Sequence, residues 1–365
     1  MDLVVKEEFR RRAEALHRAS PVVDAHLDLA GEILIRQRLG EREIIRSRYL
    51  PGWKRAGINL IVSSIYVPDD VLQRGGVLAA WEDALSQISA LEREIEAARE
   101  LMAVRSRGDL QKAVSGEGIG ILIYMEGLDC IGEDLERLSE LYDLGVRGAS
   151  LTWSRRNALA AGCCKAGQRI RISGGLTELG KSAVRRMERL SLFLDVSHLN
   201  DDGFEDVKKI ARRPFCATHS GAKAVCENYR NLTDEQMEAL ASRDGVMGLN
   251  GCKYIAGSLS GNHLEMLCRH AEYEVNRMGP GHVGFGFDLC DSYDAAKADL
   301  DYADRIGRGE RSEKREIELC DCLPDHGSIP LLSAALLQRG MEEETVRGIM
   351  GGNFVRYFEK VLPSR

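Results

Sequence analysis

Short apolar runs alternate with longer amphipathic segments along most of this chain. Eight of the runs are predicted strands, at residues 22–26, 58–66, 119–125, 146–152, 192–197, 214–218, 245–250 and 282–287. The segments between them have helical spacing, at 77–103, 133–143, 176–190, 203–211, 233–243 and 262–278. This alternation is typical of parallel βα units, and eight such units predict a closed, TIM-type (β/α)8 barrel of the α/β class.

The main alternative is an open, doubly wound α/β sheet. That architecture commonly has a glycine-rich phosphate loop after its first strand, and no such loop follows residue 26 here. We therefore expect one barrel domain over residues 1–365, since barrels of this length are common. It would have an N-terminal helix within 1–20, the barrel strands within 22–288, and a partly irregular, charged excursion followed by helices in 289–365.

Composition narrows the possible partners and compartment. The formal net charge is -7 and the pI is about 5.8, which argues against nucleic acid or an anionic membrane as a partner. The charged first residues and the lack of an 18-residue apolar run predict neither a leader nor a membrane span. Ten scattered cysteines indicate reduced thiols, so we expect a cytoplasmic protein.

Side chains with metal-ligand or acid/base chemistry stand where five of the apolar runs end. Barrel active sites lie at the carboxyl ends of the strands, so these side chains are expected to meet at one mouth. The residues concerned are His26, Asp28, Glu126, His198, His219 and Asp288.

Three imidazoles and two carboxylates can hold two metal ions, with one carboxylate bridging them. Two neighbouring cations would deprotonate a shared water and so create a nucleophile at neutral pH. Asp288 can then move the proton to a leaving amine. Taken singly, each residue has a simpler explanation: a His26–Asp28 hydrogen bond, histidines satisfied within the core, and a hydrogen-bond acceptor on the rim.

In this order, the motifs make the chain resemble the membrane (renal) dipeptidase family. That family is a branch of the amidohydrolase superfamily, with a (β/α)8 barrel and two zinc ions. The resemblance runs from Val23 to Asn353. Its motifs are DAHLD at 24–28, EG at 126–127, GLTELG at 175–180, DVSH at 195–198, THS at 218–220, RNL at 230–232, GFGFD at 284–288 and GGNF at 351–354.

The resemblance implies a metallo-dipeptidase that hydrolyses small dipeptides and is expected to form a homodimer. It implies that His26 and Asp28 bind the first Zn²⁺, that His198 and His219 bind the second, and that Glu126 bridges the two. Asp288 would transfer the proton. Arg230 would bind the substrate's free α-carboxylate, which the guanidinium fork suits.

Two positions depart from the family pattern. Trp153 stands where the family commonly has a histidine that contacts the scissile carbonyl oxygen, and an indole N–H can donate but cannot be charged. After Asp288 the chain reads Leu289-Cys290-Asp291 instead of the family's aromatic-Asp-Gly. Trp153 is therefore a candidate for substrate contact or for simple packing.

These departures leave three hypotheses for function. The first is a dipeptidase. The second is a hydrolase of N-acyl amino acids or of another small amide or lactone on the same metal site. The third is a binding protein with a vestigial site, which the complete set of five ligands argues against.

Three further histidines carry weaker predictions. His263 and His270 lie seven apart on one helix and are expected on its solvent side. His326 lies in a loop before the last helices, where it can overhang the mouth and contact substrate.

Overall fold

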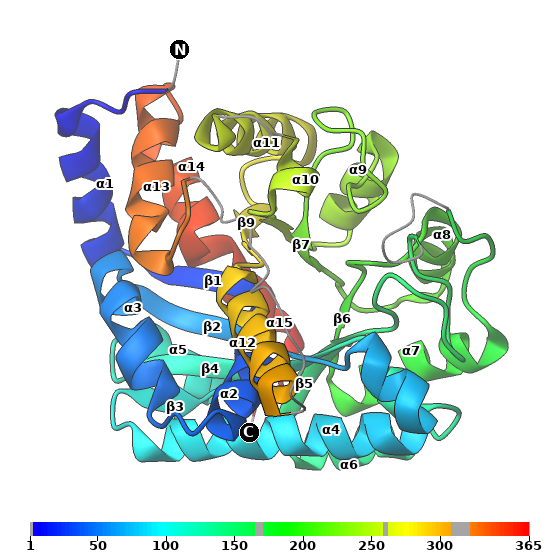
Figure 1. Cartoon of the computed structure of the whole chain (residues 1–365). Helices are drawn as coiled ribbons and strands as arrows, with labels where there is room; N and C mark the ends of the chain where they lie inside the picture. The colour runs from blue at the N-terminus through cyan, green and yellow to red at the C-terminus, as the bar shows by residue number, and fades with distance from the viewer. Residues whose placement is uncertain (1–2, 165–170, 258–261, 308–321, 365) are drawn as a thin grey trace.

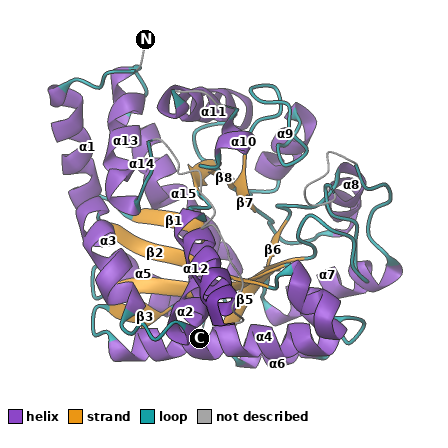
Figure 2. Cartoon of the chain, viewed as in Figure 1, coloured by secondary structure: helices purple, strands orange, loops and turns teal. Residues whose placement is uncertain are grey.

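A central set of parallel strands is surrounded by helices (Figure 1, Figure 2). The computed structural model describes residues 3–164, 171–257, 262–307 and 322–364. All eight predicted strands are present, and β3 is an additional short one. The strands are β1 (Val22–Leu27), β2 (Ile58–Tyr66), β3 (Leu101–Ala103), β4 (Ile119–Glu126), β5 (Val146–Ser150), β6 (Phe193–Asp195), β7 (Ala217–Ser220), β8 (Met247–Leu249) and β9 (Val283–Phe285).

The strands form two parallel sheets that meet at two junctions. One sheet has the order β1-β2-β4-β5-β6, with β3 paired to β4, and the other has the order β7-β8-β9. A parallel bridge between Asp195 and Cys216 joins β6 to the start of β7. At the β1–β9 junction, the N–H of Asp288 donates to the carbonyl oxygen of His26 at 3.3 Å. The fold is therefore the (β/α)8 barrel that the sequence predicts.

Helices connect the strands and cover the outside of the barrel. The N-terminal helix packs against α13, near the other end of the chain (Figure 1). The helices are α1 (Glu7–Ala19), α2 (Leu29–Arg38), α3 (Leu50–Ala56), α4 (Asp69–Ala97), α5 (Arg107–Val114), α6 (Arg137–Asp143), α7 (Glu178–Leu190), α8 (Asp201–Ile210), α9 (Asp234–Ser242), α10 (Lys253–Ala256), α11 (His263–Met278), α12 (Asp291–Gly307), α13 (Ile329–Gln338), α14 (Glu343–Arg347) and α15 (Asn353–Val361).

Side chains that alternate along the strands form two separate hydrophobic clusters. Leu60 and Val62 of β2 and Tyr124 of β4 pack in one cluster with Phe354 and Phe358 of α15. The strand residues between them pack in a separate cluster with the surrounding helices. This two-residue period follows from the pleat of a strand. It leaves α15 filling one end of the barrel, so the polar strand ends gather at the other.

One segment differs from its sequence-based prediction, and a second is described only in part. Residues 77–103 were expected to be one helix, but α4 ends at Ala97, and Leu101–Ala103 pair with Ile119–Ile121 of β4. The excursion after β9 begins with the regular helix α12, whereas residues 308–321 lie outside the described part. Among the described residues, no helix is both long and apolar enough to cross a membrane.

Candidate metal centre

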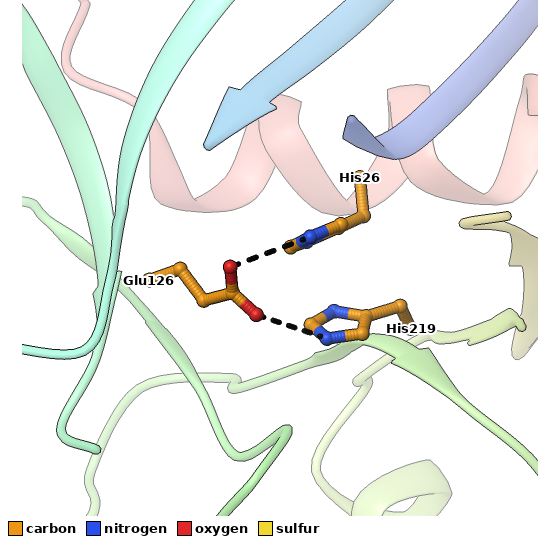
Figure 3. Close-up of side chains that lie close together, drawn as sticks. All are labelled: His26, Glu126 and His219. Carbon is orange, nitrogen blue, oxygen red and sulfur yellow. Dashed lines mark ion pairs between the residues drawn. The ribbon is translucent and has the colours of Figure 1, made fainter. Parts of the chain in front are cut away.

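Three side chains from three separate strands converge at the mouth of the barrel. His26 is the next-to-last residue of β1, Glu126 ends β4, and His219 lies in β7. A ligand atom of each lies within 4.8 Å of the other two (Figure 3). A second such group joins His26 to Asp28 and Asp288. His26 therefore belongs to both groups.

The two carboxylate oxygens of Glu126 face different imidazoles. Its Oε1 lies 2.9 Å from Nε2 of His198 and 3.4 Å from Nε2 of His219, whereas its Oε2 lies 3.7 Å from Nε2 of His26. Donors that share one tetrahedral zinc ion are separated by about 3.3 Å, given metal–ligand distances of about 2.0–2.2 Å. These separations are close to that value on both sides of Glu126.

Asp28 and Asp288 complete the side of the site that faces His26. Nε2 of His26 lies 3.8 Å from Oδ1 of Asp28 and 3.7 Å from Oδ1 of Asp288. Asp28 is the first residue after β1, and the hydroxyl of Ser64 donates to it. Asp288 follows β9 by three residues in a left-handed conformation, with φ of 56°.

The backbone at two site residues is held in an uncommon region. His198 has φ of 68° and Asp288 has φ of 56°. Non-glycine residues adopt positive φ infrequently, and such residues cluster at functional sites. The unusual turns aim both side chains into the mouth, which a continued strand would not do.

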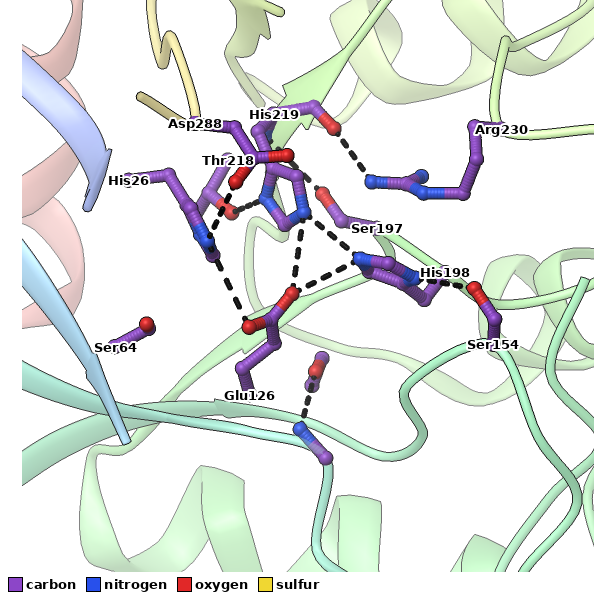
Figure 4. Close-up of polar contacts among 12 residues, drawn as sticks. His26, Ser64, Glu126, Ser154, Ser197, His198, Thr218, His219, Arg230 and Asp288 are labelled. Atoms are coloured by element: carbon purple, nitrogen blue, oxygen red, sulfur yellow. Dashed lines mark hydrogen bonds and ion pairs between the residues drawn. The ribbon is translucent and has the colours of Figure 1, made fainter. Parts of the chain in front are cut away.

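A hydroxyl oxygen contacts Nδ1 of each of the three imidazoles, and Figure 4 shows the contacts to His198 and His219. The distances are 2.8 Å from Tyr124 to His26, 2.8 Å from Ser154 to His198 and 2.8 Å from Thr218 to His219. Thr218 also donates to Oδ2 of Asp195 at 2.6 Å, which leaves its oxygen able to accept from His219. Metal binding through Nε2 requires the proton on Nδ1, and an acceptor stands there in every case.

Burial disfavours negative charge on the three carboxylates. It raises the pKa of Asp28 to about 6 and that of Asp288 to about 8, with the negative charge of Asp28 adding to the second shift. Burial also raises the pKa of Glu126 well above its usual range, reinforced by Asp28 and Asp288. Three adjacent carboxylates that are largely withdrawn from water need either protons or cations to balance their charge.

The imidazoles cannot supply that balance. Burial lowers the pKa of His26, His198 and His219 well below the usual histidine value, and the positive charge of Arg230 acts in the same direction. Nε2 of His26 is fully buried and has no hydrogen-bond partner among the described residues. Neutral imidazoles, clustered carboxylates and an unpartnered buried nitrogen fit divalent metal ions such as zinc.

Arg230 lies at the edge of the cluster (Figure 4). Its Nη2 donates to the carbonyl oxygen of His219 at 2.9 Å. The residue is 5% exposed, and its buried Nε has no partner in the described structure. One side of the guanidinium is therefore fixed by the barrel, and the buried Nε is left without a hydrogen-bond partner among the described residues.

Trp153 forms part of the wall beside His198. Its ring is stacked on the His198 imidazole with centroids 5.5 Å apart, and it contacts Tyr66 at 5.2 Å. The guanidinium of Arg155 lies 5.6 Å from the Trp153 ring centroid. The indole therefore packs against a predicted metal ligand and is also partly accessible at the mouth.

The structure brings all eight predicted site residues to this mouth, while their chemical roles remain predictions. It adds hydroxyls that sequence reasoning did not assign. Thr218 stands in the quoted THS motif, and Tyr124 precedes Glu126 by two residues on the same strand face, so both were within reach of a pattern argument. Ser154 has no such signal, because an irregular loop brings it to His198.

Comparisons with known proteins agree with this arrangement. Residues 10–306 match the model of the membrane dipeptidase family, peptidase family M19. Dipeptidase 3 of Mus musculus is 27% identical over 97% of this chain and 67% of its own length.

Two solved structures are similar over nearly their whole length. The dipeptidase AC, a metallo peptidase of family M19, is 26% identical with a TM-score of 0.78, covering 94% of this chain and 99% of its own. A metallo peptidase from Rhodobacter sphaeroides, liganded with a phosphinate mimic of the dipeptide L-Ala-D-Ala, is 26% identical with a TM-score of 0.77 over the same shares. This chain therefore belongs to the membrane dipeptidase family, peptidase family M19, a family of metallo-dipeptidases.

Proposed function

We propose that this enzyme hydrolyses dipeptides with two zinc ions bridged by Glu126. The observation that carries the proposal is the division of the Glu126 carboxylate, one oxygen toward His198 and His219 and the other toward His26. His26 and Asp28 would hold one ion, and His198 and His219 the other. Zinc bound there would lower the pKa of a water molecule and polarise the substrate carbonyl.

Asp288 is proposed to move the proton during hydrolysis. Its Oδ1 lies 3.7 Å from Nε2 of His26, so a carboxylate acceptor stands beside the position proposed for the zinc ions. It would take the proton of the attacking water and return it to the nitrogen of the departing amine. The N–H of Asp288 bonds the backbone of His26, which fixes the carboxylate relative to the ligands.

Arg230 is proposed to bind the free α-carboxylate of the substrate. The guanidinium is buried beside His219 with an unpartnered Nε, and a charge-assisted bond to a carboxylate would satisfy that nitrogen. Support for a dipeptide comes from the Rhodobacter sphaeroides relative, whose ligand mimics one.

A second candidate substrate class is the N-acyl amino acids. The observation in its favour is Trp153, an uncharged apolar ring at the mouth. An acyl chain can pack against this ring where the substrate has no free amino group. These substrates keep the α-carboxylate and the amide bond, so they would use the same residues.

The test measures turnover and metal content together. Zinc-loaded protein is assayed on L-L and L-D dipeptides, N-acyl amino acids and dipeptide amides, with bound zinc counted per chain. We expect two zinc ions, dipeptide turnover, and loss of both zinc and activity in Glu126→Gln. A zinc content that saturates at one ion per chain or fewer, or a Glu126→Gln variant that behaves like the parent, would exclude the two-metal proposal.

Arg230→Met tests the substrate's carboxylate contact. We expect kcat/KM for dipeptides to fall about 100-fold, the loss of a charged hydrogen bond worth about 1.5–3 kcal/mol, with little change for dipeptide amides. Arg243→Met is the matched control, because Arg243 also donates to backbone carbonyls, those of Ala211 and Lys208, away from the mouth. An equal loss for dipeptides and amides would remove Arg230 from this role.

A further inference from the structure

Two thiols lie beside Asp288 on the side away from the imidazoles. Cys252 lies three residues after the end of β8, and Cys290 lies two residues after Asp288. Each cysteine sulfur and a carboxylate oxygen of Asp288 lie within 4.8 Å of one another. The Sγ of Cys252 donates to Oδ2 of Asp288 at 3.4 Å and to its carbonyl oxygen at 3.4 Å. Both cysteines are reduced.

Backbone contacts between the loops after β8 and β9 hold the thiols in place. The N–H of Cys252 donates to Oδ1 of Asn250 at 2.7 Å, and the N–H of Cys290 donates to the carbonyl of Asp288 at 2.8 Å. The N–H of Gly251 donates to the carbonyl of Phe287 at 2.7 Å, which ties one loop to the other. The cluster is thus built by the fold rather than by a chance meeting of long side chains.

The two oxygens of Asp288 face two different sets of donors. Oδ1 lies 3.7 Å from Nε2 of His26, inside the imidazole cluster. Oδ2 faces the thiol of Cys252 and lies 3.4 Å from Nδ2 of Asn250. Asp288 therefore stands between the proposed zinc pair and a separate group of two sulfurs and one oxygen.

The spacing of that group suits a soft divalent cation. A tetrahedral zinc ion with a Zn–S distance of about 2.3 Å and a Zn–O distance of about 2.0 Å separates sulfur from oxygen by about 3.5 Å. The observed distance between Sγ of Cys252 and Oδ2 of Asp288 is 3.4 Å. Thiolates select zinc and softer ions over magnesium or calcium.

We propose that Cys252, Cys290 and Asp288 form a third cation site, which takes Cd²⁺ or excess Zn²⁺ and inhibits the enzyme. Binding exchanges the two thiol protons, which pass to solvent, for one divalent ion held by two thiolates and Oδ2. A cation on Oδ2 withdraws Asp288 from proton transfer. The site rests on its own geometry, and only the inhibition depends on the proposed function.

The test titrates the zinc-loaded enzyme with Cd²⁺. It follows activity and the ultraviolet charge-transfer absorption of thiolate-bound Cd²⁺. We expect the absorption to saturate at one additional ion per chain while activity is lost. In Cys252→Ser/Cys290→Ser the absorption should vanish, and the inhibition constant should rise more than about tenfold, because two of the few ligands are gone. Cys290→Ser alone, at a half-buried loop position, guards against misfolding of the double variant and should weaken binding in the same direction.

Cys163→Ser/Cys164→Ser is the matched control. This pair, with sulfurs 3.7 Å apart, lies on the other side of the mouth, where Cys163 contacts Ser154. The control should keep both the absorption and the inhibition. Absorption that persists without Cys252 and Cys290, or that disappears in the control, would overturn the proposed site. A cysteine-dependent absorption on a protein without dipeptidase activity would instead uphold the site and reject the proposed function.

Discussion

At the scale of single residues, the hydroxyl groups that contact Nδ1 of His26, His198 and His219 orient the three imidazoles. The contact from Thr218 to Nδ1 of His219 continues to the buried carboxylate of Asp195. Asp195 also accepts from the N–H groups of Ser197 and Thr218, at 2.9 Å and 3.0 Å. One carboxylate therefore orients both the loop that carries His198 and the strand that carries His219.

This arrangement predicts the effect of removing one hydroxyl. We expect Thr218→Val to weaken metal binding about 10–100-fold, the usual effect of losing a partner of a metal-ligating histidine, while the fold is retained. The measurement is the zinc dissociation constant by competition with a chelator.

Ser220→Ala provides the comparison. Ser220 lies on the same strand, and its buried hydroxyl has no hydrogen-bond partner among the described residues. The zinc affinity of Ser220→Ala should equal that of the parent protein. Equal weakening in both variants would show that strand packing, and not the contact to His219, controls the ligand.

At the scale of elements, α11 shows where helical spacing alone misleads. His263 and His270 were expected on its solvent side, but they are 1% and 1% exposed. His270 contacts the carbonyl of Ala256 through Nε2, and its Nδ1 accepts from the N–H of Ala222. The loops after β7 and β8 cover this face of the helix, and a hydrophobic pattern does not reveal a face buried by polar contacts.

We predict that the buried carboxylate of Glu274, on the same helix, lowers the free energy of unfolding at neutral pH. It is 0% exposed, and its oxygens have no hydrogen-bond partner in the described structure. Oε1 lies 3.7 Å from Nδ1 of His270, and burial outweighs this contact and raises the pKa of Glu274. A raised carboxyl pKa favours the folded state below the unfolded pKa, near 4.3, and this contribution is lost as pH rises. We therefore expect Glu274→Gln to stabilise the protein by about 1–3 kcal/mol at pH 8 and by less at pH 5.

Thermal or urea unfolding at both pH values measures this difference. Glu272→Gln, two residues earlier, removes the ion pair with Arg339 and should cost less than about 1 kcal/mol. Glu274→Gln would contradict the prediction if it were equally destabilising at pH 5 and pH 8.

The strands were predictable because each is a short apolar run with a polar end. The eight predicted strands and the candidate ligands at their ends therefore follow from pattern alone. The Leu101–Ala103 strand was not predictable, since three residues fit a helix end as well as a strand. Ser154 and Cys252 reach the site through loop geometry, and no spacing in the sequence encodes it.

At the scale of the whole molecule, the β1–β9 junction depends on a residue far along the chain. Nε2 of His326 lies 2.9 Å from Oδ2 of Asp24, and both side chains are buried. Oδ1 of Asp24 accepts from the N–H groups of His26 and Phe287. His326 was a candidate for substrate contact, but it instead supports the carboxylate that joins β1 to the segment before Asp288.

We expect His326→Ala to lower the free energy of unfolding by about 2–3 kcal/mol, because one oxygen of the buried Asp24 loses its partner. His326→Gln, which keeps a donor, should recover part of the loss. Asp325→Ala removes only an exposed ion pair with Arg55 and should cost less than about 1 kcal/mol. Urea unfolding measures the free energies of unfolding of the three variants. Equal values for His326→Ala and Asp325→Ala would contradict the predicted support of Asp24 by His326.

The contact between His326 and Asp24, which lie far apart in the sequence, has a consequence for biosynthesis. β1 leaves the ribosome well before His326, whose side chain supports Asp24. Every proposed zinc ligand precedes His326 in the chain, so these residues emerge before the contact with Asp24 can form. We therefore expect the β1–β9 junction of a nascent chain to be weaker, and its hold on zinc looser, until His326 has emerged.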